Sequence, residues 1–309
     1  MDVDATVEAI KSMEIRGAGK IARAGASALS DFAENYKGED IAAFRRDLGV
    51  AKEKILGSRP TAVSLWNGVH ATLRGADKCA TAKEAKEMII ANASAFNESS
   101  LHAVKFIGEI GAKRIQDGDV ILTHCNSSAA LSVIKTAFRQ GKKFKVYATE
   151  SRPWRQGILT VNELAKEGID VTLIIDSAVR SVMKNVTKVF VGADTITSHG
   201  TLINKVGTSQ VALAANEARV QVYVCSETYK FSPMTLFGDM VTIEERDHAE
   251  VIGNAKLEPG VKIFNPVFDS TPSKYIDAII TEVGMIAPGS VYHVMTSQLG
   301  DEIFRLVGE

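Results

Sequence analysis

Apolar residues in the first third of the chain recur at helical spacing. Between positions 40 and 56, Ile41, Phe44, Leu48 and Ile55 fall close to one face of a helix. Four other stretches have helical composition, at positions 5–15, 20–35, 61–74 and 81–116. No convincing strand precedes Asp117. The pattern therefore predicts a helical N-terminal domain over residues 1–116.

The pattern changes after Asp117, where short apolar runs rich in β-branched residues begin. The runs are VILTHC at 120–125, FKVYATES at 144–151, DVTLIID at 170–176, KVFVGAD at 188–194, VQVYVCSE at 220–227 and VKIFNPVFD at 261–269. Helical segments separate most of them, at 127–140, 156–167, 178–185 and 207–218. Alternation of this kind predicts an α/β domain over 117–309, with a parallel sheet covered by helices on both faces.

Charge and cysteine content narrow the functional classes. With 36 Lys and Arg against 37 Asp and Glu, the formal charge is −1, so no overall field attracts nucleic acid or an anionic membrane. A local basic pocket for a phosphorylated ligand remains possible. The three cysteines cannot all pair, and no apolar leader or membrane-length run is present, which predicts free thiols in a reducing, cytoplasmic compartment. The sequence thus excludes a secreted disulfide scaffold, a membrane protein and a disordered chain.

Cys125 is the first candidate for chemistry, because ligands of parallel sheets bind at the carboxyl ends of strands. It precedes Ser127, Ser128 and Ala129, which are expected to begin a helix. The backbone amides of such small residues at a helix start are open to a phosphate. A thiol near a helix start is expected to have a lowered pKa. A buried structural cysteine is an equally weighted alternative. Successive side chains of a strand point to opposite faces, so His124 points away from Cys125. We expect it to be a packed or hydrogen-bonded histidine.

Asp194 ends another run and is expected to face the same edge as a general acid or base. The commoner use of such an Asp is to accept loop amides, and that alternative stays open. Asn204 and Lys205 precede a helix that begins near Ser209, where the lysine and the helix start could clamp a phosphate. Lys230 follows a further strand. A solvated loop lysine is the alternative for both lysines.

The segment Arg16, Gly17, Ala18 and Gly19 contains a partial dinucleotide fingerprint. That motif needs a preceding strand, whereas a helix is expected before it, and a phosphate-binding loop would need Gly where Glu14 stands. We therefore expect no nucleotide cofactor there, only a backbone-rich anion site. Arg59 is a second candidate phosphate ligand. No metal is expected, because the His and Cys residues show no ligand spacing.

Together these segments resemble the superfamily that joins aldose 1-phosphate isomerases to regulatory subunits of a translation initiation exchange factor. The resemblance covers nearly the whole chain. Its motifs are Arg16–Gly19, Ser58–Thr61, Thr123–Ser128, Ser151–Pro153, Gly192–Asp194, Asn204–Thr208, Asn265–Asp269 and Ile280–Glu282. Several ordered motifs in one chain are far more specific than any single one.

Within this superfamily the chain is most similar to archaeal ribose 1,5-bisphosphate isomerases. Cys125 and Asp194 are typically lacking in the regulatory subunits. Methylthioribose-1-phosphate isomerases typically read Cys-Asn-Ala-Gly in place of residues 125–128 and lack the Tyr-Lys-Phe of residues 229–231. A second substrate phosphate explains additional cations such as Lys230 and Arg59. A methylthioribose-1-phosphate isomerase and a non-enzymatic regulatory subunit remain the alternatives.

The resemblance implies a Rossmann-like C-terminal domain without NAD, and a homo-oligomer built from dimers, such as a hexamer. It implies conversion of α-D-ribose 1,5-bisphosphate to D-ribulose 1,5-bisphosphate in AMP and nucleoside degradation. We hypothesise that protonated Asp194 donates to the ring oxygen and that Cys125, as thiolate, takes the C2 proton, giving a phosphoenol. The residues expected to hold the two phosphates are Arg16, Gly17, Ala18, Gly19, Arg59, Ser127, Ser128, Ala129, Asn204, Lys205 and Lys230.

Overall fold

The computed structural model describes residues 2–238 and 240–299 of the 309-residue chain, which forms two compact units, Met1–His102 and Ala103–Glu309. The boundary between the units falls within one long helix, α5 (Ala82–Ala112). The first strand begins at Val120. The sequence places a domain boundary at 116/117, where helical composition changes to strand composition, and this boundary remains a prediction.

The N-terminal unit is helical in all its described regular elements. These are α1 (Val3–Lys11), α2 (Ala18–Asn35), α3 (Ile41–Ser58), α4 (Val63–Leu73), the 3-10 turn η1 (Ala76–Lys78) and the first part of α5. Asp2 and Asp40 cap α1 and α3 by accepting backbone amides of the first turn. The helices enclose their own apolar core, which includes fully buried Phe44, Ile55 and Leu65.

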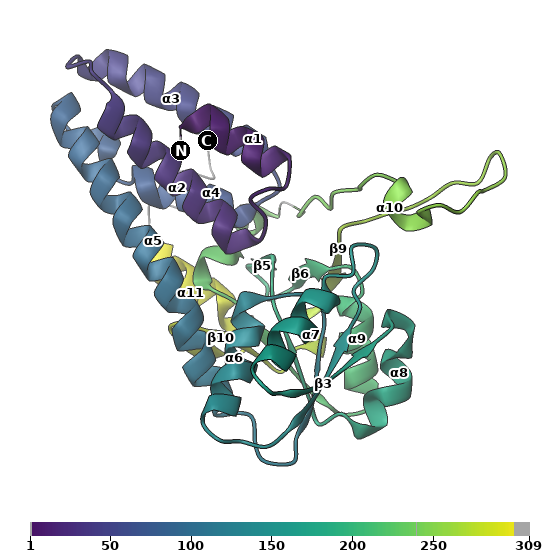
Figure 1. The fold of residues 1–309 in the computed structure, drawn as a ribbon. Helices are drawn as coiled ribbons and strands as arrows, with labels where there is room; N and C mark the ends of the chain where they lie inside the picture. The colour runs from purple at the N-terminus through teal and green to yellow at the C-terminus, as the bar shows by residue number, and fades with distance from the viewer. Residues whose placement is uncertain (1, 239, 300–309) are drawn as a thin grey trace. The chain divides into compact units, whose positions relative to one another are not determined.

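The C-terminal unit, in which Figure 1 labels the helices α6 to α9, is built on a seven-stranded sheet of order β11-β10-β7-β4-β1-β2-β3. Neighbouring strands run parallel except for the pair β10–β11. The strands are β1 (Val120–Thr123), β2 (Lys145–Thr149), β3 (Asp170–Ile174), β4 (Lys188–Val191), β7 (Gln221–Cys225), β10 (Ala278–Thr281) and β11 (Gly284–Ile286). The predicted α/β class, with a helical N-terminal part and a parallel sheet in the C-terminal part, is confirmed.

Helices form an apolar core on each face of this sheet. One core contains Ile134 from α6 (Ser128–Arg139), Leu164 from α7 (Gly157–Lys166) and Ile107 from the end of α5. The other contains Val179 from α8 (Val179–Val182) and Val211 from α9 (Thr208–Glu217). The strands between the two cores are therefore apolar on both sides, as their sequence indicated.

A second, four-stranded sheet was not predicted, and its order is β8-β5-β6-β9. Its strands are β5 (Thr195–Thr197), β6 (Leu202–Lys205), β8 (Phe231–Ser232) and β9 (Phe268–Thr271). They are only two to four residues long, too short for a period to be recognised in the sequence.

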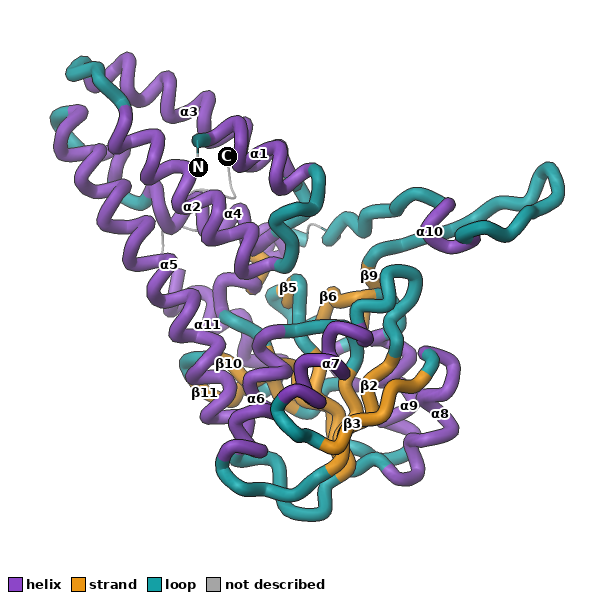
Figure 2. Tube along the Cα trace, viewed as in Figure 1, coloured by secondary structure: helices purple, strands orange, loops and turns teal. Residues whose placement is uncertain are grey.

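The prediction of a strand at 261–269 is wrong over most of this range. Only its last two residues belong to a strand, β9, which lies in the small sheet. The preceding chain is loop apart from α10 (Ala249–Ile252), as Figure 2 shows, with one isolated bridge between Glu245 and Pro266. The remaining regular elements are η2 (Asp176–Ala178), η3 (Met183–Asn185), η4 (Thr228–Lys230), η5 (Met234–Phe237), η6 (Ser273–Tyr275), η7 (Pro288–Ser290) and α11 (Val291–Leu299). Among the described helices, none combines the length and apolar character that a membrane crossing needs.

Two helical glycines of the N-terminal unit should respond oppositely to alanine. A Cβ on Gly25 in α2 would lie 2.6 Å from Cδ1 of fully buried Leu65, whereas one on Gly49 in α3 would meet no atom within 4 Å. We expect Gly25→Ala to lower the free energy of unfolding by about 1–3 kcal/mol through overpacking. Gly49→Ala should raise it by about 0.5–1 kcal/mol through helix propensity. Urea unfolding of the full chain measures both, and equal effects of the two changes would contradict this packing.

Candidate functional site

Cys125 and Asp194 follow the two strands between which the strand order of the large sheet reverses. β1 is followed in the chain by β2 and β3 on one side, while β4 pairs with β1 on the other side. Ligands of open α/β sheets bind at such a switch point, beyond the carboxyl ends of the strands. The two strand ends approach closely, because a Cβ on Gly192 would lie 2.2 Å from Oγ of Ser127.

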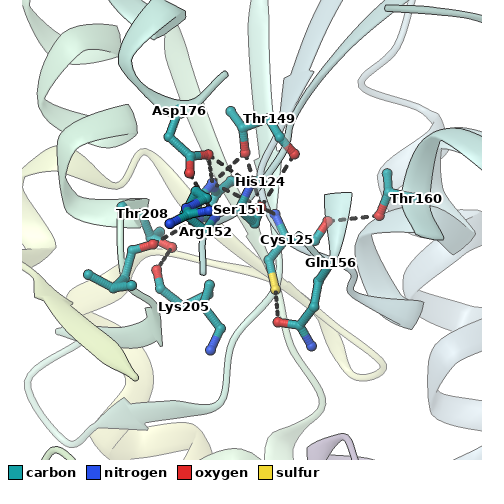
Figure 3. Close-up of polar contacts among 12 residues, drawn as sticks. His124, Cys125, Thr149, Ser151, Arg152, Gln156, Thr160, Asp176, Lys205 and Thr208 are labelled. Carbon is teal, nitrogen blue, oxygen red and sulfur yellow. Dashed lines mark hydrogen bonds and ion pairs between the residues drawn. The ribbon is translucent and has the colours of Figure 1, made fainter. Parts of the chain in front are cut away.

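Cys125 is held in an uncommon backbone conformation at the end of β1 (Figure 3). Its φ of +70° lies in the left-handed region, which few residues other than glycine adopt. Its amide donates to Oγ of Ser151 at 2.7 Å, and its carbonyl accepts from Oγ1 of Thr160 at 2.8 Å. The thiol donates to Oε1 of Gln156 at 3.3 Å. Cys125 is thus fixed at its amide, its carbonyl and its sulfur.

Burial raises the pKa of the Cys125 thiol to about 11, and the Lys205 ammonium is the main group that opposes this rise. The negative charges of Asp194 and Asp176 raise it further. The expectation of a lowered thiol pKa is therefore wrong for the substrate-free site. The physical reason is desolvation, which outweighs the helix start because α6 begins only at Ser128.

His124 is a buried, hydrogen-bonded histidine, as expected. Its Nδ1 lies 2.6 Å from Oγ1 of Thr149, and its Nε2 lies 2.9 Å from the carbonyl oxygen of Val206. Burial lowers the pKa of His124, although nearby Asp176 opposes this change. A Cβ on Gly207 would lie 2.9 Å from Cε1 of the ring, so only a glycine allows this approach. His124 therefore links the ends of β1 and β2 to the turn before α9.

The small sheet brings Asp194 beside the other candidate residues of the C-terminal unit. Asp194 precedes β5, and its amide donates to the carbonyl of Ile203 in β6 at 3.1 Å. Asn204 and Lys205 end the same strand. Lys230 directly precedes β8, which runs parallel to β5. The backbone pairing of this sheet thus gathers residues that are far apart in the sequence.

The start of α9 is occupied by a carboxylate of the chain itself. Asp269 accepts the amide of Gly207 at 2.7 Å and that of Ser209 at 3.1 Å. Burial raises the pKa of Asp269 to about 6, although these two hydrogen bonds lower it. The expectation that this helix start is open to a phosphate is therefore wrong, because Asp269 already binds its amides.

Asn204 and Lys205 lie at the other side of this turn. The buried side-chain amide of Asn204 donates to Oγ1 of Thr208 at 3.0 Å. Nζ of Lys205 lies 5.3 Å from the ring centre of Phe268. Lys205 also acts on the Cys125 thiol through its charge, as described above. The direct binding of a phosphate by Asn204 and Lys205 stays a prediction.

Lys230 is buried, so the alternative of a solvated loop lysine is wrong. Its Nζ lies 2.7 Å from Oε2 of Glu227, and both side chains are less than a tenth exposed. Burial alone raises the pKa of Glu227, but the Lys230 charge and hydrogen bonds lower it overall. Lys230 thus has a counter-ion within the protein, and its contact with a second phosphate stays a prediction.

The residues predicted to bind phosphate through backbone amides lie around the starts of α6 and α2. Ser127 caps α6 by accepting the amide of Ala130 at 3.4 Å, Ser128 is exposed and Ala129 is buried. In the N-terminal unit, Gly17 has a φ of +90° and precedes α2, whose start has no side-chain cap. The placement of Arg16, Gly17, Ala18, Gly19 and Arg59 around a substrate stays a prediction.

Four residues that shape this site were not among the residues predicted from the sequence. Ser151 and Asp176 each lie two residues beyond the end of a strand, β2 and β3 respectively, so the rule that led to Cys125 also points to them. Asp269 carried the same signal, since it ends the run expected at 261–269, whereas Gln156 carried none and is brought here by the turn before α7. Within residues 2–238 and 240–299, no group of three or more His, Cys, Asp or Glu side chains could hold a metal ion.

The sequence matches known proteins over most of its length. Residues 14–288 match the model of the initiation factor 2 subunit family. A protein of Archaeoglobus fulgidus named ribose 1,5-bisphosphate isomerase is 53% identical over 95% of this chain and 92% of its own length. A protein of the same name from Methanocaldococcus jannaschii is 50% identical over 96% of this chain and 94% of its own length.

Solved structures of similar fold carry more than one kind of name. Translation initiation factor eIF-2B from Pyrococcus horikoshii OT3 matches with a TM-score of 0.79 and 34% identity, over 93% of this chain and 97% of that one. 5-Methylthioribose 1-phosphate isomerase from the same organism matches with a TM-score of 0.77 and 28% identity, over 97% and 88%. Proteins with the names of an enzyme and of a translation factor thus share this fold. The fold alone therefore does not give the function, which has to be inferred from the site.

Asp269 should make the stability of the protein depend on pH in a defined direction. Its pKa is raised from 3.8 to about 6, so between these values the folded state binds more protons than the unfolded chain. Its contribution to the free energy of unfolding is therefore greatest below about pH 4 and is lost as the pH rises to about 6. The loss amounts to at most about 3 kcal/mol.

Asp269→Asn cannot titrate and serves as the reference. Urea unfolding at constant ionic strength should show the wild type losing stability relative to Asp269→Asn between about pH 4 and pH 6, with no further change above that. A difference between the two proteins that is the same at pH 4 and pH 7 would contradict a buried carboxylate at this helix start.

Proposed function

The chain belongs to the initiation factor 2 subunit family, and we propose that it converts α-D-ribose 1,5-bisphosphate to D-ribulose 1,5-bisphosphate. The observation that carries the proposal is the pair Cys125 and Asp194 at the switch point of the sheet, with Lys205 acting on the thiol. The names of the relatives at 53% and 50% identity support the same activity. The proposal includes a role in AMP degradation, a cytoplasmic location and a homo-oligomer built from dimers.

The substrate determines which catalytic groups are needed. Its C1 carries a phosphate, so the ring cannot open to a free aldehyde as in an ordinary aldose. The ring oxygen must receive a proton as its bond to C1 breaks, and C2 must lose one. In the proposed mechanism, Asp194 donates the first proton and Cys125 accepts the second. The resulting phosphoenol is protonated at C1 and its C2 hydroxyl loses a proton, which gives the ketose phosphate.

The environment of the thiol sets a condition on this mechanism. Since burial favours the neutral thiol, the Cys125 proton must leave the sulfur before the sulfur can accept the C2 proton. The Lys205 ammonium favours that ionisation, because it is the main group that lowers the thiol pKa. Gln156 accepts the thiol hydrogen in the substrate-free state and thereby orients the sulfur. Lys205 therefore has a proposed role in thiolate formation as well as in phosphate binding.

The two phosphates supply most of the proposed binding energy. Cationic side chains and backbone amides suit phosphate oxygens, and holding both ends of the sugar keeps C1 and C2 in place during the proton transfers. We propose that the ligands are Arg16, Gly17, Ala18, Gly19, Arg59, Ser127, Ser128, Ala129, Asn204, Lys205 and Lys230. The second phosphate distinguishes this substrate from methylthioribose 1-phosphate.

Replacing either catalytic group should abolish most of the turnover. Cys125→Ser and Asp194→Asn keep the size of the side chain but remove the proton-transfer group, so kcat for ribose 1,5-bisphosphate should fall by at least about 100-fold. Cys79→Ala, which alters a buried cysteine of the N-terminal unit, is the matched control and should keep its activity. Formation of ribulose 1,5-bisphosphate measures the effect.

Three results would contradict the proposal. Full activity of Cys125→Ser and Asp194→Asn would eliminate the mechanism. Turnover of methylthioribose 1-phosphate in preference to the bisphosphate would eliminate the substrate. Absence of turnover with either sugar, together with binding to a partner subunit, would instead favour a regulatory protein.

The role of Lys230 can be tested by comparing two substrates. Lys230→Met alone would leave Glu227 buried without its counter-ion, so the change is made together with Glu227→Gln. If Lys230 binds the second phosphate, KM for the bisphosphate should rise on the order of tenfold or more, whereas KM for ribose 1-phosphate should change little. Glu227→Gln alone is the control. An equal effect on both substrates would show that Lys230 does not bind the second phosphate.

A further inference from the structure

We propose that Ser151 and Thr149 are positioning residues that hold Cys125 in its reactive conformation through a directed chain of hydrogen bonds from His124. This inference rests on the proposed function, since it assigns Cys125 the role of base. Neither residue has an assigned role in the mechanism above. Thr149 is the last residue of β2, the strand beside β1, and Ser151 lies two residues beyond it; both are fully buried.

The direction of the chain follows from its fixed end. The carbonyl oxygen of Val206 can only accept, so Nε2 of His124 carries a hydrogen and donates to it at 2.9 Å. A buried His124 with a lowered pKa is neutral, which leaves Nδ1 as an acceptor. The hydroxyl of Thr149, 2.6 Å away, must therefore donate to Nδ1.

The remaining links point the same way. With its hydrogen committed to the imidazole, Oγ1 of Thr149 is free to accept from Oγ of Ser151 at 3.1 Å. Oγ of Ser151 in turn accepts the amide hydrogen of Cys125 at 2.7 Å. Oγ of Ser151 also lies 3.4 Å from the carbonyl oxygen of Thr149 and 3.4 Å from Nδ1 of His124, so Oγ1 of Thr149 is the nearest of its three acceptors. Along these shortest contacts each group donates once toward His124, and Figure 3 draws the residues involved. Hydrogen bonds arranged head to tail in a buried site strengthen one another.

A second set of bonds fixes Ser151 itself. Its φ is +60°, and its amide donates to Oδ1 of Asp176 at 2.8 Å. The amide of Arg152 donates to Oδ2 of the same carboxylate at 2.8 Å. Asp176 lies two residues beyond the end of β3. The ends of three adjacent strands therefore support one hydroxyl, and that hydroxyl binds the backbone of the proposed base.

The consequence concerns the geometry of the sulfur. A cysteine at φ +70° occupies a conformation that is unfavourable without outside support. Without the Ser151 hydroxyl, the Cys125 amide loses its acceptor, and the backbone can relax toward commoner φ values. That relaxation moves Sγ away from its contact with Gln156 and from its buried surroundings.

The experiment uses the full-length protein and four variants. Ser151→Ala removes the hydroxyl next to Cys125, and Thr149→Val breaks the chain one step earlier with nearly the same shape. Thr149→Ser keeps the hydroxyl and is the conservative rescue. Thr281→Val is the matched control, because Thr281 is equally buried and donates to the carbonyl of Gly284 outside the chain. Circular dichroism establishes that each variant is folded, and Thr149→Val tests the chain independently if Ser151→Ala is unstable.

Two readouts are measured, namely steady-state turnover of ribose 1,5-bisphosphate and the pH dependence of Cys125 alkylation by iodoacetamide. We expect Ser151→Ala and Thr149→Val to lose kcat by about 100-fold, with less than about threefold change in KM. In both, the midpoint of the alkylation profile should fall from near 11 toward the ordinary thiol value of 9.0. Thr149→Ser and Thr281→Val should stay within about threefold of wild-type kcat, because the hydrogen-bond chain persists.

The inference is overturned if Ser151→Ala and Thr149→Val keep wild-type kcat and the wild-type alkylation midpoint. It is also overturned if Thr149→Ser loses as much kcat as Thr149→Val. Should the wild type fail to turn over the bisphosphate, the proposed function falls, and the alkylation midpoint alone decides on the positioning chain. A shift in both variants then supports the chain, and no shift overturns it.

Discussion

The buried imidazole of His124 connects the loops from which the candidate site is built. It hydrogen-bonds to Thr149 at the end of β2 and to the carbonyl of Val206 in the turn before α9, and it stands between the last residue of β1 and Cys125. A neutral imidazole offers one donor and one acceptor, and burial keeps both committed. The position of the thiol therefore depends on two segments that lie far from it in the sequence.

The same burial changes the ionisation of the groups around it. Burial raises the pKa of Cys125 and of Asp269, because both lose water when the strand ends pack together. Lys205 is the main group that offsets this effect at the thiol. In the proposed mechanism a cation near the sulfur therefore favours the thiolate, apart from any part it has in binding a phosphate.

The small sheet determines which residues lie on the strands beside Asp194. Its strands bring Asn204 and Lys205 next to Asp194 and place Lys230 at the start of the paired strand β8. Backbone pairing fixes this arrangement without a large apolar core of its own. Asp269, in β9 of the same sheet, occupies the helix start that the sequence pattern had suggested for a phosphate.

The hydrophobic pattern alone determined the helical first part, the parallel sheet and the strand ends that carry Cys125 and Asp194, because buried helices and strands impose their own periods on the sequence. It also indicated a hydrogen-bonded His124. The small sheet, the loop over 261–267, the rise in the Cys125 pKa and the ion pair of Lys230 were decided by the tertiary structure. These features arise from contacts between residues distant in the sequence, and desolvation by such contacts leaves no periodic signal along the chain.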